Sequence, residues 1–532
     1  MSKLFVYSRN ALFTWGGYGA NLVVLLLLSP FVVRCLGDRA YGVWTMLMGM
    51  TGYLGLAELG VRVSTGRFIN FHLGRHDSES FNRVIVSSLA FYGVISAVVL
   101  AATALLGWAG PGLLERASPW LAQWLSPHML QAAHDMAQPA RWVLPLLGLN
   151  VALGFFAATF GQILCASDRF DLLTWADLGA LVVRAAGTVL VLWAGGGFVA
   201  LAVVNVATAA VGLVGRLAAA RRWGPAFVLS ARYLCRRTLG EVMRFGGWSF
   251  ISNTANLLIH YTDTILIGLL LGPECVTAYA IGLLLVEHGR RLLFDGVGVI
   301  SPDIMKAAGR QDNPALHRLM ISGTRAAVAL ALPMLAAFLI FGQEFITLWM
   351  GPGRQESGRI LAILTLSLFG GTASRPAIAV LSGIGCVRFL AAECIAEGLL
   401  NLGLSVVLVC ALHWGIDGVA IGTLVPMLIF NNLLVPAFAC RRMGLGVASY
   451  FAATAGRWIP VALATVALAA LIRAALPGGG WLSFATKVAI LLAAYAPLAV
   501  GVVLGPHERA RVFQTVGQLL RLRGGIAIEK EA

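Results

Sequence analysis

Apolar stretches long enough to cross a bilayer recur along the whole chain and limit what it can fold into. Blocks such as Leu22–Leu28 and Ile490–Tyr495 contain only apolar residues, whereas the strands of a transmembrane barrel alternate apolar and polar residues. A spanning helix needs about 20 apolar residues. Because only 12% of the 532 residues are charged, against roughly a quarter in soluble domains, we predict an all-α polytopic membrane protein.

Charged residues and Gly/Pro clusters divide the apolar sequence into about 14 candidate transmembrane helices. They cover residues 11–34, 41–65, 84–107, 141–164, 175–194, 198–215, 245–271, 276–300, 322–342, 358–382, 388–412, 416–438, 458–476 and 481–504. The first block is too long for the apolar core of a cleaved signal peptide, so we expect it to be retained.

The distribution of basic residues predicts the orientation. With the N-terminus inside, 25 of the 39 Lys and Arg residues fall in cytoplasmic segments and six in outer segments, as the positive-inside rule requires. Both termini are then cytoplasmic, in a bacterial inner membrane. The longest basic stretch, 216–244, contains seven arginines and lies between the sixth and seventh spans.

A weak internal repeat predicts two halves in the same orientation. Ala20-Asn21-Leu22, followed by Leu36-Gly37, recurs 235 residues later as Ala255-Asn256-Leu257, followed by Leu271-Gly272. Parallel repeats of this kind occur in transporters. We therefore expect an N-terminal lobe of six spans (1–216), a basic cytoplasmic linker (217–244), a C-terminal lobe of six spans (245–440), and two extra spans with a basic tail (441–532).

Sequence motifs for catalysis are absent. The four lysines lie outside any GxxxxGK[ST] phosphate loop, and the chain has neither HExxH nor GxSxG. The eight cysteines are scattered without metal-binding spacing, and no segment is large enough to form a catalytic domain outside the membrane. We expect no enzyme activity, no catalytic residue, no metal site and no nucleic-acid partner.

Eight basic residues fall within spans, where a charge at the bilayer centre costs at least about 2.5–3.5 kcal/mol. Arg325, Arg473 and Lys487 are near span ends and can extend to the interface. The other five are Arg62, Arg184, Arg290, Arg291 and Arg375.

Helical spacing aligns these arginines with other polar residues. Glu58 lies four residues before Arg62, and Asp177 lies seven before Arg184; Glu287, Arg291 and Asp295 step by four, with Arg290 alongside. Two further stripes are formed by Asn253, Asn256, His260 and Asp263 and by Glu393, Glu397 and Asn401. Such stripes either pair across helices as structural contacts or line a polar interior. Arg375 has no acid nearby in its own helix, and deep arginines favour an anionic substrate such as a phosphate.

The opening of the chain resembles a known transporter family. Pro30-Phe31…Arg34-Cys35-Leu36-Gly37…Tyr41-Gly42-Val43-Trp44…Gly52-Tyr53…Glu58-Leu59-Gly60 is similar to the start of Wzx-type polysaccharide flippases of the multidrug/oligosaccharidyl-lipid/polysaccharide exporter superfamily. Asp263-Thr264-Ile265-Leu266-Ile267-Gly268 resembles the seventh span of that family. The likeness covers roughly 8–440, and the two extra C-terminal spans are shared with lipid II flippases.

The resemblance implies two six-helix lobes around a central cavity that flip undecaprenyl-pyrophosphate-linked glycans outward by alternating access. In related lipid flippases, arginines of the first, second and eighth spans face the cavity. Arg62, Arg290 and Arg291 fit the latter two, whereas the first span has only Arg34, at its outer end.

We therefore expect a substrate-anion site at Arg62, Arg290, Arg291, Arg375 and Arg184, with Glu58, Asn256, His260, Asp263, Glu287 and Glu397 as cavity groups or optional H⁺ or Na⁺ coupling sites. No other cofactor is expected. The expected partners are membrane lipids, the lipid-linked glycan, a polysaccharide polymerase and glycosyltransferases. The alternatives are a lipid II flippase, a cation-coupled multidrug exporter of the same superfamily, and a membrane-bound glycan polymerase or ligase.

Overall fold

The computed structural model describes residues 3–121, 127–499 and 501, and every element in these ranges is a helix. The side chains of residues 247–260 are outside this description, and so is the predicted basic tail beyond residue 501. The chain divides into two compact units, Met1–Ala280 and Ile281–Ala532. Since this division falls inside a helix rather than between the sixth and seventh spans, the predicted lobe boundaries remain a prediction.

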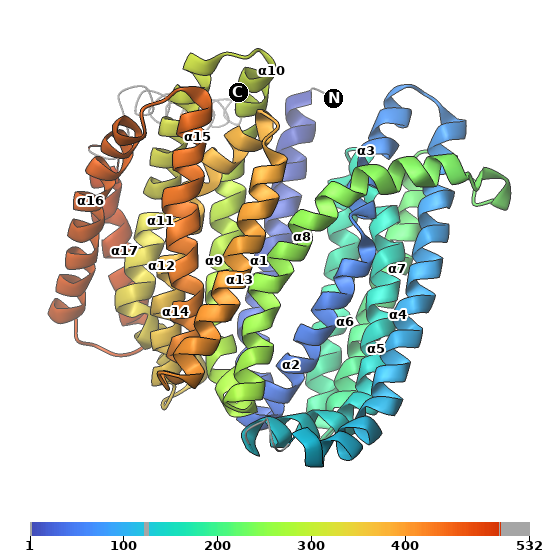
Figure 1. Ribbon diagram of the computed structural model, residues 1–532, viewed down its shortest axis with the longest axis horizontal. Helices are drawn as coiled ribbons and strands as arrows, with labels where there is room; N and C mark the ends of the chain where they lie inside the picture. Colours follow the sequence, from blue (N-terminus) through green and yellow to red (C-terminus); the bar gives the residue numbers. More distant parts are fainter. Residues whose placement is uncertain (1–2, 122–126, 500, 502–532) are drawn as a thin grey trace, which may run out of the picture. The chain divides into compact units, whose positions relative to one another are not determined.

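Unit 1 contains eight α-helices and the start of a ninth. They are α1 (Lys3–Leu36), α2 (Asp38–Leu54), α3 (Val61–Gly74), α4 (Ser78–Leu121), α5 (Pro127–Ala166), α6 (Phe170–Trp193), α7 (Phe198–Trp223) and α8 (Arg236–Leu270), with the short 3₁₀ turns η1 (Gly55–Glu58) and η2 (Ala231–Tyr233). Helices α4 to α7 run side by side, and α1 packs on α6 (Figure 1).

Unit 2 contains the rest of α9 (Pro273–Gly298), α10 (Ser301–Gly309), α11 (Asn313–Met350), α12 (Gln355–Gly383), α13 (Val387–Cys410), α14 (Gly415–Met427), the π-helix η3 (Leu428–Leu434), α15 (Val435–Met443), α16 (Val447–Ala475) and α17 (Trp481–Leu498). Helix α12 is the most enclosed of its long apolar helices. It packs against α11, α14 and η3.

Eleven helices in the described ranges are long and apolar enough to cross a membrane. Within the described ranges, each of the fourteen predicted segments falls on helix. The three that do not reach this standard are the second, seventh and eighth, which correspond to α2–α3, α8 and α9. These are segments to which the sequence assigns charged or polar stripes, and the exact count of fourteen stays a prediction.

The second predicted span is broken rather than continuous. Leu59 and Gly60 both adopt left-handed backbone conformations, with φ of 49° and 71°, between η1 and α3. Gly60 is required here for a second reason, because a Cβ would lie 2.2 Å from the carbonyl oxygen of Gly246 in α8. Glu58 and Arg62 therefore lie on opposite sides of a break, not on one helical face.

Glycines allow α9 to pack closely against its neighbours in unit 2. A Cβ at Gly282 would lie 2.9 Å from the carbonyl oxygen of Ser357 in α12, and one at Gly289 would lie 2.8 Å from the Sδ of Met334 in α11. Small residues allow this close approach of helices within a membrane. This packing fixes the rotation of α9 and so the direction in which its charged residues point.

Polar contacts join the two C-terminal helices to α11. Arg325 donates two hydrogen bonds to the carbonyl oxygen of Ala453, and Arg473 donates one to that of Ile340. Lys487, which we expected to extend to the interface, is instead buried. Its Nζ lies 2.8 Å from Oε1 of Glu344, because a partner within the protein replaces water.

Candidate functional site

Two of the five deep arginines converge on one phenyl ring in unit 2. The guanidinium carbon of Arg375 in α12 lies 4.5 Å from the ring centroid of Phe294 in α9, and that of Arg290 lies 5.5 Å from it. Arg290 also forms an ion pair with Glu287. For Arg375, no hydrogen bond or ion pair is found among the described residues. The site thus keeps one cation without an ion-paired carboxylate among the described residues, although the carboxylate of Asp295 in α9 is near enough to interact with it electrostatically.

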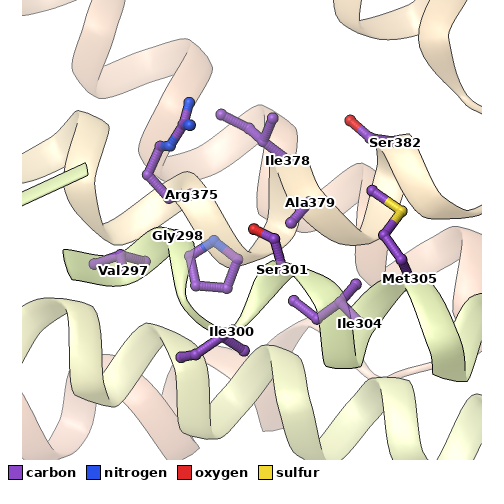
Figure 2. Close-up of a pocket in the computed structure, with 11 residues that line it drawn as sticks. Val297, Gly298, Ile300, Ser301, Ile304, Met305, Arg375, Ile378, Ala379 and Ser382 are labelled. Atoms are coloured by element: carbon purple, nitrogen blue, oxygen red, sulfur yellow. The ribbon is translucent and has the colours of Figure 1, made fainter. Parts of the chain in front are cut away.

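A cavity of about 190 Å³ adjoins Arg375. Figure 2 shows Arg375 at one end of the cavity, Met305 and Ser382 at the other, and Ser301 between them. The remaining lining is mostly apolar and comes from the end of α9, the turn into α10, and α12: Val297, Gly298, Ile300, Ile304, Pro376, Ile378 and Ala379. A guanidinium beside hydroxyl groups and an apolar wall suits an amphiphilic anion.

A chain of buried polar groups runs from α13 to the residue before Arg375. Asn431 of η3 donates a hydrogen bond from Nδ2 to Oε2 of Glu397, at 3.0 Å. The hydroxyl of Ser374 donates to Oδ1 of the same asparagine, at 3.1 Å. Glu393, one helical turn before Glu397, is also buried, and its Oε1 has no hydrogen-bond partner among the described residues.

Arg62 and Glu58 lie in unit 1 and still form a loose pair across the break. Arg62 Nε is 3.8 Å from Glu58 Oε1, and the arginine side chain is 52% exposed. The hydroxyl of Tyr92 in α4 also donates to Glu58, at 3.3 Å. The guanidinium is therefore accessible at the surface of unit 1, as a binding role requires.

Arg184 and Asp177 do not pair with each other. Arg184 donates from Nη2 to Oδ1 of Asn21 in α1, at 2.7 Å, whereas Asp177 accepts from Arg216 of α7 at 2.7 Å. The spacing of seven places both on one side of α6, but each finds a nearer partner on another helix. Arg184 therefore joins α1 to α6.

The polar stripe predicted in the seventh span is described only in part. Asp263 of α8 is buried, and its Oδ2 accepts a hydrogen bond of 2.9 Å from the hydroxyl of Tyr279. The side chains of Asn256 and His260 lie outside the described residues. In the eighth span, Arg291 is exposed on α9, next to the exposed Leu292, while Glu287 pairs with Arg290.

Sequence reasoning missed Phe294, Ser374 and Asn431. Phe294 and Ser374 carry no distinguishing sequence signal. Asn431 and Asn432 do, because two adjacent amides within an apolar span are costly unless they are hydrogen-bonded.

Comparison with known proteins identifies the family. Residues 8–293 match the family model described as polysaccharide biosynthesis protein. The uncharacterised membrane protein EpsK of Bacillus subtilis (strain 168) is 21% identical over 444 residues, covering 80% of this chain and 83% of EpsK. A candidate O-antigen transporter of Shigella flexneri is 21% identical over 371 residues, covering 68% of this chain and 81% of that protein.

Solved structures show the same fold at low identity. An inward-facing multidrug resistance MATE family transporter of the MOP superfamily has a TM-score of 0.67 at 16% identity, covering 80% of this chain and 98% of its own. The lipid II flippase MurJ, in an inward closed conformation, has a TM-score of 0.66 at 12% identity and covers 92% of this chain and 98% of its own. The chain therefore belongs to the polysaccharide biosynthesis protein family, which confirms the predicted resemblance to Wzx-type polysaccharide flippases.

Proposed function

We propose that this membrane transporter flips an undecaprenyl-pyrophosphate-linked glycan, such as an O-antigen or exopolysaccharide repeat unit, from the inner to the outer leaflet by alternating access. The observation that carries the proposal is the convergence of Arg290 and Arg375 on Phe294, with no ion pair or hydrogen bond to Arg375 among the described residues. A diphosphate supplies the missing negative charge, and arginine binds phosphate oxygens with paired hydrogen bonds.

The cavity beside Arg375 supports an amphiphilic substrate. Its hydroxyl groups, from Ser301 and Ser382, can bond phosphate or sugar oxygens, while its isoleucines offer an apolar surface. Arg62, on unit 1, is an exposed arginine that we propose as a second contact. Arg291 is also exposed and stays a candidate contact, whereas Arg184 is a weaker candidate because it is bonded to Asn21.

Ion coupling is a further part of the proposal. Glu393 and Glu397 are 9% and 5% exposed, and no basic side chain within the described ranges pairs with either. A carboxylate pair in such surroundings takes up a proton or a cation to avoid the cost of buried charge. We propose this pair as a coupling site for H⁺ or Na⁺, with Asp263 as a second candidate.

Substrate flipping in proteoliposomes tests the arginine site. With a fluorescent undecaprenyl-diphosphate oligosaccharide, Arg375→Gln and Arg290→Gln should each lower the flipping rate by about 10- to 100-fold, the loss of one charge-assisted contact of roughly 1.5–3 kcal/mol. The exposed Arg310 of the same unit provides the matched control, since Arg310→Gln should leave the rate unchanged. Normal flipping by both test variants, at normal protein levels, would reject the site.

The choice of glycan is tested with the same preparation. A repeat-unit flippase should carry several diphosphate-linked oligosaccharides and should leave lipid II in place, whereas preferential movement of lipid II would favour the MurJ-like alternative. Glycosyltransferase and polymerase genes beside this gene would further support polysaccharide export and the partners that we propose.

A cation-coupled multidrug exporter is the second candidate, favoured by the buried Glu393–Glu397 pair. Such a protein would bind cationic drugs at its acids, and the deep arginines would repel them. Expression in a drug-hypersensitive bacterial host decides between the two. Increased resistance to cationic drugs that is lost in Glu397→Gln would support the exporter.

A further inference from the structure

One hydrogen-bonded chain links the buried acid pair to the helix that carries Arg375. It consists of Glu397 in α13, Asn431 in η3 and Ser374 in α12, and it has one bond at 3.0 Å and one at 3.1 Å. The exposed fractions of these residues are 5%, 8% and 1%. Because water has little access, their polar atoms depend on one another for hydrogen bonds.

The acid end of the chain is the part that changes charge. Titratable and charged groups lie on several of the elements around Glu393 and Glu397. Arg388 and Cys394 lie on α13 itself, Cys440, Arg441 and Arg442 lie on α15, and Glu356 lies in the first turn of α12. Asp417 of α14 is bonded to Arg359 of α12, at 3.1 Å, and Arg375 of α12 faces Phe294. Within the described ranges, no cation neutralises the pair, so proton or cation uptake sets its charge.

The other end of the chain meets two helices at points where their backbones are irregular. Pro376 cannot donate a backbone hydrogen bond to the carbonyl oxygen of Thr372, which weakens α12 next to Arg375. Opposite it, η3 is a π-helix, a form that occurs frequently at functional sites. The two approach closely, since a Cβ at Gly370 would lie 2.5 Å from Nδ2 of Asn432.

Ser374 has a second acceptor, which allows the chain to switch. Its hydroxyl can donate either to Oδ1 of Asn431 or to the carbonyl oxygen of Gly371, at 3.0 Å, in its own helix. An ionised Glu397 holds Asn431 through a charge-assisted bond, and a neutral Glu397 holds it less strongly. Release of Asn431 then frees Ser374 to bond within α12.

We infer that Asn431 is a positioning residue that couples proton or cation occupancy of the Glu393–Glu397 pair to the position of Arg375, and so to affinity for a diphosphate. This inference rests on the proposed function. Asn431 itself contacts neither substrate nor ion in this scheme. It transmits the charge state of the Glu393–Glu397 pair in α13 to α12, through the contact between η3 and the part of α12 around Pro376.

Equilibrium binding of undecaprenyl diphosphate to the full-length protein in nanodiscs tests the inference. The dissociation constant is measured from pH 5.5 to 8.5 with and without Na⁺. The ligand titrates too, so Glu393→Gln/Glu397→Gln gives the dependence that remains without the acid pair. Across this pH range, the change in the dissociation constant of wild type should differ from that of this reference variant by at least about fivefold. The change for Asn431→Leu should match that of the reference variant within about twofold.

A matched control and a milder variant accompany these measurements. Asn401 is a buried asparagine of α13 that bonds to Thr423, at 2.9 Å, and is not part of the chain, so Asn401→Leu should behave as wild type. Ser374→Ala removes only the hydroxyl oxygen and serves as the test if Asn431→Leu fails to fold. Its dissociation constant should depend on pH and Na⁺ as that of the reference variant does.

The outcomes separate the two proposals. Retention of the wild-type dependence by Asn431→Leu, or by Ser374→Ala where the former does not fold, overturns the coupling role. The coupling role is also overturned if the dissociation constant of wild type depends on pH and Na⁺ as that of Glu393→Gln/Glu397→Gln does. In that case, diphosphate binding by wild type still supports the proposed function. Wild type that binds no diphosphate rejects the proposed function, and the coupling inference falls with it.

Discussion

At the scale of single residues, charges inside the spans could be located from the sequence, whereas their partners could not. Asp177 pairs with Arg216 rather than with Arg184, and Lys487 pairs with Glu344, 143 residues away. Helical spacing reports which residues share a face of one helix, but an ion pair depends on which helices are neighbours. Arg375 is the informative case, because it has no acid nearby in its own helix and forms no ion pair among the described residues, and its role as a substrate contact stays a prediction.

The Lys487–Glu344 pair gives a prediction about stability. Lys487 is 3% exposed at its side chain, and removing one partner of a buried pair typically costs about 3–5 kcal/mol, because a charge is left uncompensated. Lys487→Met should therefore lower the thermal unfolding midpoint of the purified protein markedly. Lys487→Met/Glu344→Leu should recover most of the loss, since no unpaired charge remains.

Lys306 provides the control for this experiment. It forms an exposed pair with Asp303, at 3.5 Å, of the kind that contributes about 0–1 kcal/mol. Lys306→Met should leave the unfolding midpoint nearly unchanged. An equal effect of the two lysine substitutions would show that burial of Lys487 contributes nothing.

At the scale of elements, hydropathy placed each of the fourteen predicted spans on helix in the described ranges but did not reveal the irregularities of these helices. The predicted span 41–65 contains the break at Leu59 and Gly60, and the span 416–438 contains η3. A window of about 20 residues averages over such local changes in backbone. The break depends on two left-handed residues and on the close approach of α8, and neither changes the hydropathy of the segment.

Gly60 therefore gives a prediction about folding. Alanine at φ of 71° costs roughly 1–2 kcal/mol, and its Cβ would also meet the carbonyl oxygen of Gly246 at 2.2 Å. Gly60→Ala should reduce the yield of folded protein in size-exclusion chromatography. Gly55 is the matched control, with φ of −59° and no atom within 4 Å of an added Cβ; a similar loss in Gly55→Ala would refute the role of the break.

At the scale of the whole molecule, the low content of charge acquires a functional meaning. Most of the basic residues fall in segments that we predict to be cytoplasmic, and few lie deep in the predicted spans. Two of those few, Arg290 and Arg375, face the same ring in unit 2. Because only Arg290 of these two forms an ion pair among the described residues, the arrangement fits the anionic cargo that we propose.

The membrane potential then becomes the expected driving force. Moving about two negative charges outward through an inside-negative potential of about 100 mV is favourable by roughly 4.6 kcal/mol. Potassium gradients with valinomycin set the potential in proteoliposomes without a proton or Na⁺ gradient. Flipping of a diphosphate-linked oligosaccharide toward the positive side should accelerate as the potential is raised, and reversing the sign should slow it.

Variants of the acid pair separate the potential from ion coupling. If the potential alone can drive the cycle, Glu393→Gln/Glu397→Gln should keep its response to the potential. It should lose the part of its response to pH and Na⁺ that depends on the acid pair. If the flipping rate of wild type does not change with the potential but follows a Na⁺ or proton gradient, strict ion coupling replaces this scheme. In that case the buried carboxyls of α13, rather than the net charge of the cargo, would supply the direction of transport.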